Sequence, residues 1–201
     1  DSTFLYYFGI DFPALAAVID VDNNLQIIFG DDYTIDDIVW MGPQPTIAER
    51  AGEVGVSHIQ PTLELATMLH EALKQGRNVH YLPPYRPENK LKLQHLLFLH
   101  PDHIAQKSSL KLIRAVVSQR EIKSAEEIVE IEKGVDLSVD MHVAAMQMAR
   151  PGMTEAQVAA RVYEIAHAAN GEISFPIIAT INGQTLHNHY HGNVLKSGDL
   201  F

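Results

Sequence analysis

The sequence contains no cysteine among its 201 residues, which excludes disulfides, a thiolate nucleophile and zinc sites built on cysteine. It also lacks a run of Lys and Arg, since 15 basic residues face 25 acidic ones and the formal net charge is −10. This balance argues against nucleic acid and an anionic membrane surface as partners. No apolar run approaches the roughly 20 residues of a membrane-spanning helix. The acidic, cysteine-free composition favours a cytoplasmic location.

The two ends of the sequence lack the features of chain termini. The opening stretch DSTFLYYFGIDF has no basic leader before its apolar residues, so it does not predict a signal peptide. Residues 3–8 instead have the character of a strand that begins with nothing upstream, and the final SGDLF starts a new apolar run. We therefore expect an internal fragment of a longer protein.

The first half of the sequence alternates strand and helix patterns. Residues 14–30 predict two strands around an Asp-Asn-Asn turn, and a capping box of Thr46 and Glu49 predicts a helix after them. Further helices are expected over residues 62–76 and 87–99, with a short strand over residues 78–84 between them. This alternation predicts an α/β domain that covers residues 1–115.

The second half, residues 116–201, predicts two helices and a hairpin. A long amphipathic helix and a shorter one are each announced by a capping box, formed by Ser124 with Glu127 and by Thr154 with Gln157. The stretch SFPIIATINGQTLHNHYH then predicts two β segments around Asn182-Gly183. The histidines near its end are therefore expected on a strand or just beyond it.

Three of these histidines, His187, His189 and His191, occupy alternate positions in TLHNHYHGN. On a strand, alternate residues share one face and lie about 7 Å apart. A catalytic zinc site needs about three protein ligands and a structural one about four, and no carboxylate alternates with these histidines. The pattern favours a polar strand face over a metal site, but a histidine-rich metal-binding protein that uses all three rings stays open.

Several stretches together resemble one known family. REIKSAEEIVEIEKG resembles the R-x-x-K-S-x-E-E-I opening of the catalytic domain of proline-directed peptidases, and ARPGMTEAQV resembles their R-P-G-M-x-E helix junction. SFPIIATINGQTLHNH resembles their strand pair that ends in Leu-His, and SGDLF their G-D-L strand. In the first half, DSTFLYYFGID and IVWMG resemble segments of the creatinase-like N-terminal domain. The chain thus resembles the pita-bread metallopeptidases, closest to the aminopeptidase P and prolidase branch.

The resemblance implies an α/β creatinase-like N-terminal domain followed by the start of a pita-bread α+β catalytic domain. It implies a metal-dependent exopeptidase that cleaves the bond between an N-terminal residue and a penultimate proline with a metal-bridging hydroxide. The metal pair, usually Mn²⁺, would be held by two Asp, one His and two Glu. All five are expected downstream of Phe201, so this fragment is expected to be inactive. The family also suggests a homo-oligomer.

Within the fragment the resemblance assigns one site residue. His187 matches the histidine of the Leu-His pair, which binds substrate and takes part in catalysis without being a metal ligand. No role is carried over to His189 or His191. The main alternative is a pita-bread protein without catalysis that binds peptides or proteins. A creatinase-type amidinohydrolase shares the architecture, but its catalytic-domain segments are less similar. The preference between dipeptides and longer peptides stays open.

Overall fold

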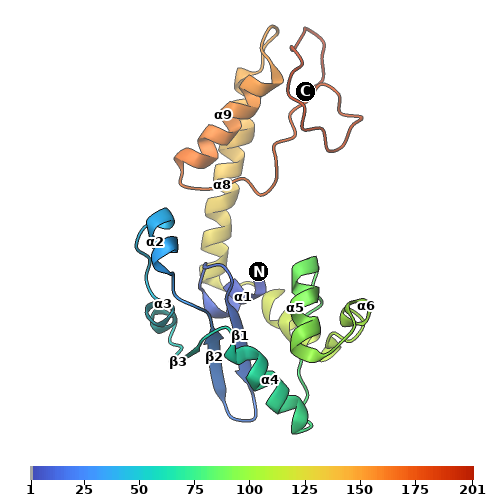
Figure 1. Cartoon of the computed structure of the whole chain (residues 1–201). Helices are drawn as coiled ribbons and strands as arrows, with labels where there is room; N and C mark the ends of the chain where they lie inside the picture. The colour runs from blue at the N-terminus through green and yellow to red at the C-terminus, as the bar shows by residue number, and fades with distance from the viewer. Residues whose placement is uncertain (1) are drawn as a thin grey trace. The chain divides into compact units, whose positions relative to one another are not determined.

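Residues 16–29 fold as the predicted hairpin. In the computed structural model, which describes residues 2–201, strand β1 (Ala16–Asp20) pairs antiparallel with strand β2 (Leu25–Phe29). Strand β3 (His58–Gln60) pairs parallel with β2, so β2 is the middle strand of the three (Figure 1). A middle strand has no free edge, and β2 is also the most buried of the three strands.

The molecule divides into two compact units, and each is described by itself. Unit 1 ends at Ser118 and unit 2 covers Gln119–Phe201, so the division falls inside one helix, α7 (Leu110–Arg120). The domain boundary after residue 115 stays a prediction. Among residues 2–201, no helix combines the length and the apolar character that crossing a membrane requires.

Helices make up most of unit 1, and capping explains where several of them begin. Thr46 and Glu49 form the predicted capping box, with Glu49 N–H donating to the Thr46 hydroxyl at 3.2 Å and Thr46 N–H donating to the Glu49 carboxylate at 2.7 Å. The predicted helices over residues 62–76 and 87–99 are also confirmed. The helices of this unit are α1 (Ser2–Phe8), α2 (Ile35–Met41), α3 (Ile47–Glu53), α4 (Glu64–Lys74), α5 (Pro87–Leu97), α6 (Pro101–Ile104) and α7 (Leu110–Arg120).

Two strand predictions for unit 1 were wrong. Residues 3–8 lie in helix α1, where helical spacing stacks the rings of Phe4 and Phe8 with their centroids 5.1 Å apart. Residues 78–84 form no strand, because the carbonyl of Tyr81 accepts from Ser109 N–H at 3.0 Å instead of a neighbouring strand. Here tertiary contacts outweigh a local pattern that suits a strand.

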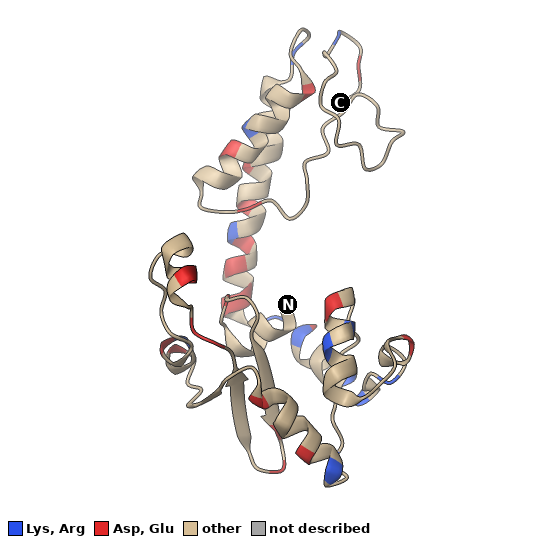
Figure 2. Cartoon of the chain, viewed as in Figure 1, with Lys and Arg blue, Asp and Glu red and all other residues tan. Residues whose placement is uncertain are grey.

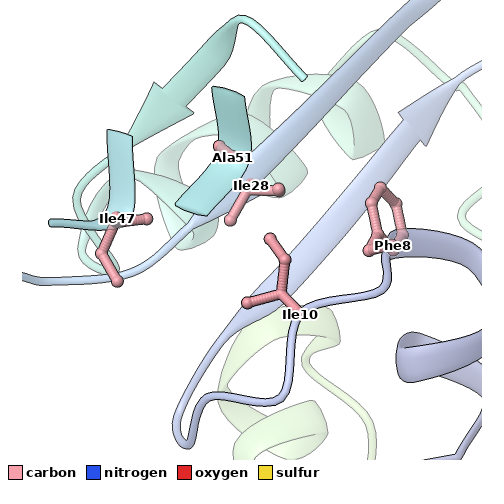
Figure 3. Packing of buried hydrophobic residues seen from close by; sticks show 5 residues of the cluster. All are labelled: Phe8, Ile10, Ile28, Ile47 and Ala51. Carbon is pink, nitrogen blue, oxygen red and sulfur yellow. The ribbon is translucent and has the colours of Figure 1, made fainter. Parts of the chain in front are cut away.

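The core of unit 1 lies on both faces of the sheet. Because successive strand residues point to opposite faces, Ile28 joins one cluster while its neighbours Ile27 and Phe29 join another with Leu65. Figure 3 shows the first cluster, in which Ile28 meets side chains from α1, the following loop and α3: Phe8, Ile10, Ile47 and Ala51. The middle strand β2 therefore anchors both halves of the core.

Unit 2 is built on two helices that pack side by side, α8 (Ala125–Met148) and α9 (Glu155–Ala168) (Figure 1). Both predicted capping boxes are confirmed, at Ser124 and at Thr154. Acidic residues follow one another along the first half of α8 (Figure 2). The predicted hairpin around residues 182–183 was wrong, because residues 169–201 contain no strand and only one isolated bridge.

Candidate functional site

His187 lies in a turn, and its side chain is exposed. The turn belongs to the histidine segment, defined as residues 181–193. His189 is exposed as well, whereas His191 is half-buried, with its Nε2 2.9 Å from the carbonyl oxygen of Ile177. Since a carbonyl only accepts, Nε2 carries the hydrogen of this bond. His191 thus fastens its segment to the preceding residues, and the shared strand face expected for the three rings does not form.

The first turn of α9 holds the end of the histidine segment. The first N–H groups of a helix have no partner within the helix. Here Glu155 N–H donates to the carbonyl oxygen of Asn193 at 3.0 Å, and Ala156 N–H donates to the carbonyl oxygen of His191 at 3.0 Å. Just before the helix, Thr154 and Val194 form an antiparallel bridge. The chain after His187 is therefore bound to the helix start by its backbone.

A buried carboxylate lies at the same place. Glu155 is fully buried, and its Oε1 accepts from Ile181 N–H at 2.8 Å while its Oε2 accepts from Asn193 N–H at 3.2 Å. The side-chain amide of Asn193 donates to both oxygens, at 3.1 and 3.0 Å. A buried charge is tolerated when it is hydrogen-bonded in this way. Glu155 thus contacts both ends of the histidine segment.

The pKa of Glu155 follows from two opposing effects. Burial raises it, and the hydrogen bonds from Ile181, Asn193 and Thr180 lower it; the bonds prevail, so the pKa lies below the ordinary value of 4.5. Glu155 is therefore ionised at neutral pH, when both of its oxygens are acceptors.

The described residues do not fit a metal pair. Within residues 2–201, no three His, Asp or Glu side chains lie close enough together to hold a metal ion. The three histidines of the segment do not form such a group either: His187 and His189 are exposed, and the Nε2 of His191 is already bonded to a carbonyl. This geometry gives no support to the histidine-rich metal-binding hypothesis.

Unit 1 carries a polar cluster of its own beside a groove of about 950 Å³ between β1, α4 and α5. Arg77 lies on this groove and donates to Asp20 at 2.9 and 2.5 Å, and to Asp22 at 2.9 and 3.2 Å. The hydrogen bonds from Arg77, followed by those from Asn23, hold the pKa of Asp20 far below its ordinary value.

Sequence reasoning missed the roles of Glu155, Asn193 and Arg77. Glu155 falls on the R-P-G-M-x-E junction, which was its only signal, because a first-turn acid also suits the helix dipole without any further contact. Asp20 has one local partner, because the backbone N–H and the side-chain amide of Asn23 both donate to it. Its second partner lies 57 residues along the chain, beyond the reach of local patterns.

Two family models match successive parts of the chain, in the order expected from the sequence. Residues 1–81 match "Aminopeptidase P, N-terminal domain", and residues 129–201 match "Metallopeptidase family M24". Among curated proteins, the probable Xaa-Pro aminopeptidase pepP of Emericella nidulans is 24% identical over 190 residues, which cover 92% of this chain and 39% of the relative. The protein of the same name from Aspergillus clavatus is 26% identical over 191 residues. The chain spans about two fifths of the length of these relatives.

Solved structures share the fold. The aminopeptidase PepP of Pseudomonas aeruginosa superimposes with a TM-score of 0.79 at 21% identity, over 99% of this chain and 47% of that one. A zinc-substituted aminopeptidase P of Escherichia coli in complex with product gives a TM-score of 0.79 at 20% identity, over 99% and 48%. The expected fold class is therefore confirmed. The two family matches and the curated relatives support a chain of the aminopeptidase P type of the M24 metallopeptidases, with an aminopeptidase P N-terminal domain followed by the start of an M24 domain.

Proposed function

We propose that the whole protein is a metal-dependent exopeptidase that hydrolyses the bond between an N-terminal residue and a penultimate proline. The observation that carries this proposal is the match of two family segments, together with the similarity of 92% of the chain to a relative named a probable Xaa-Pro aminopeptidase. The proposal extends to parts of the protein beyond this chain, because the chain spans only 39% of those relatives.

The chemistry of the substrate explains why such a peptidase is specialised. The bond before proline is a tertiary amide without an N–H, and the ring fixes φ. Peptidases that bind substrate by strand-like pairing lose a donor there. An enzyme that recognises the free N-terminus and the ring can act on this bond instead.

We assign His187 to the substrate. Its exposed ring can donate a hydrogen bond to the scissile carbonyl, where negative charge grows as the bond is attacked. Loss of one such donor typically lowers the rate by about 10²–10³-fold. His187 needs no metal bond for this role.

The metal is assigned to residues that follow Phe201, since the described residues do not fit it. When bound, a metal pair supplies a hydroxide that is nucleophilic at neutral pH. Mn²⁺ is the proposed metal. Self-association and a cytoplasmic location are proposed as well, the latter from the acidic, cysteine-free composition.

The test is Mn²⁺-dependent hydrolysis of a Gly-Pro dipeptide and an Xaa-Pro-Xaa tripeptide by the full-length protein, with this 201-residue chain assayed beside it. We expect cleavage by the full-length protein alone. Cleavage of the tripeptide only would favour an aminopeptidase P over a prolidase. If a folded, metal-loaded full-length protein cuts neither substrate, the proposal fails and the peptide-binding alternative replaces it.

The His187 assignment has its own prediction. In the full-length protein, His187→Ala should lower kcat by about 10²–10³-fold and leave the bound metal unchanged. His167→Ala, an exposed histidine on α9, is the matched control and should keep full activity. Metal analysis beside the kinetics decides the role, because loss of bound metal in His187→Ala would make His187 a ligand.

A further inference from the structure

The histidine segment has a tied base and an exposed tip. Its first residue, Ile181, and its last, Asn193, both donate backbone N–H groups to the carboxylate of Glu155. Between them, residues 183–187 are exposed, and His187 lies in this exposed part. One side chain thus joins the two points at which the segment leaves and rejoins the body of unit 2.

The other hydrogen bonds of the segment join neutral groups, or residues that are close in the sequence. The amide of Asn188 donates to the hydroxyl of Thr180 at 3.1 Å, and Thr185 N–H donates to Asn182 at 3.0 Å. These are bonds between neutral groups, whereas bonds to an ionised carboxylate are roughly twice as strong. Because Glu155 is fully buried, water cannot replace a hydrogen-bond partner that its carboxylate loses.

We propose that Glu155 is a positioning residue that clamps the base of the histidine segment and thereby sets the place of the His187 ring. The inference rests on the function proposed for His187, and it adds a residue to which no role in the reaction has been given. Glu155 does not touch substrate; it acts through His187. Its carboxylate must stay acceptor-only, because the backbone N–H groups of Ile181 and Asn193 and the side-chain amide of Asn193 all donate to its two oxygens.

Glu155→Gln is the sharpest substitution, because it keeps the size of the side chain. In either orientation the new NH₂ group would face a backbone N–H, that of Ile181 or that of Asn193, donor against donor, and the base of the segment would open. A displacement of about 1 Å at a catalytic group can cost about 10²-fold in rate. We expect kcat to fall by about 10- to 10²-fold, and never below the activity of His187→Ala.

The test is a double-mutant cycle in the full-length, metal-loaded protein. Glu155→Gln, His187→Ala and the double variant are compared by kcat and KM on a proline peptide. If Glu155 acts through His187, it has no further effect on kcat once His187 is gone. Glu164→Gln, an exposed glutamate on the same helix, is the matched control and should leave kcat unchanged. If Glu155→Gln does not fold, Asn193→Ala replaces it: this variant removes the two side-chain bonds to Glu155 and keeps both backbone bonds, so a smaller fall in kcat is expected, and this fall should also vanish once His187 is gone.

Hydrogen exchange supplies a readout independent of activity. The amides of Ile181 and Asn193 should lose protection by about tenfold or more in Glu155→Gln, while amides in the middle of α9 keep theirs. The inference is overturned if these two amides keep their protection, or if kcat falls by the same factor with and without His187. If the wild type cleaves no proline peptide, the proposed function fails, and unchanged exchange alone would then overturn the clamp.

Discussion

Arg77 binds two carboxylates with one side chain. It makes paired hydrogen bonds to Asp20, whose side chain is 4% exposed, and further bonds to Asp22, which is 76% exposed. Paired bonds of this kind need the planar guanidinium, so lysine is no substitute. The bonds join the end of β1 and the β1–β2 turn to Arg77, which lies three residues beyond the end of α4. The pKa of Arg77 rises and that of Asp20 falls for the same reason.

This pair predicts how acid affects unit 1. The pKa of Asp20 in the folded chain lies below its ordinary value of 3.8. As the pH falls, Asp20 therefore takes up a proton in the unfolded chain before it does so in the folded chain. The stabilisation is present above about pH 4 and is lost as the pH falls through and below 3.8. Arg77→Met should lower Tm at pH 7 and make its decline below pH 4 shallower, as thermal unfolding across pH would show. Lys74→Ala, which removes only an exposed pair with Glu71, should leave both unchanged.

Among the elements, capping boxes explain where several of the helices begin. Four helices, α2, α3, α8 and α9, begin with reciprocal bonds between the cap side chain and the residue three positions on. The cap of α8 matters most, because no residue of this helix is buried among the described residues. Packing against α9 therefore leaves every residue of α8 at least partly exposed, and the cap adds stability that full burial would otherwise supply.

Ser124→Ala should destabilise unit 2 by about 1 kcal/mol, because the Glu127 N–H loses its acceptor. Ser138→Ala, in the exposed middle of the same helix, is the control and should have no cost, since alanine is the better helix former there. Urea unfolding followed by helical circular dichroism measures both. Equal effects of the two substitutions would contradict the role of the cap.

The elements also show what the sequence can predict. Capping boxes and the Asp-Asn-Asn turn are local, so the helices from Thr46, Ser124 and Thr154 and the β1–β2 hairpin are confirmed. The failures, residues 3–8, 78–84 and the segment around Asn182-Gly183, are apolar stretches that suit a strand but find no strand to pair with among the described residues. For the site, the motif indicated His187, whose role stays a prediction. The hydrogen bonds of Glu155 could be found only in the structure.

For the whole molecule, each unit has buried residues of its own. Unit 1 buries Ile28 completely in its core, and unit 2 buries Val158 and Ala166 on the packed side of α9. Units with separate cores respond separately to a core substitution.

Ile28→Val removes one buried methyl group and should lower the stability of unit 1 by about 0.5–1.5 kcal/mol. Amide exchange in β2 should become faster, while exchange in α9 should not change. Ile35→Val, at a position 80% exposed, is the control and should stay within about 0.5 kcal/mol of the wild type. Faster exchange in α9 would mean that the two units unfold as one.

The mixed sheet of unit 1 implies an order of folding. The hairpin of β1 and β2 closes over the few residues of one turn, whereas the parallel pairing of β2 with β3 must wait for a chain that includes α2 and α3. Local contacts form faster than distant ones. As the chain leaves the ribosome, the hairpin can therefore close early, but β2 keeps an open edge until Ile59 is available to pair with Ile28.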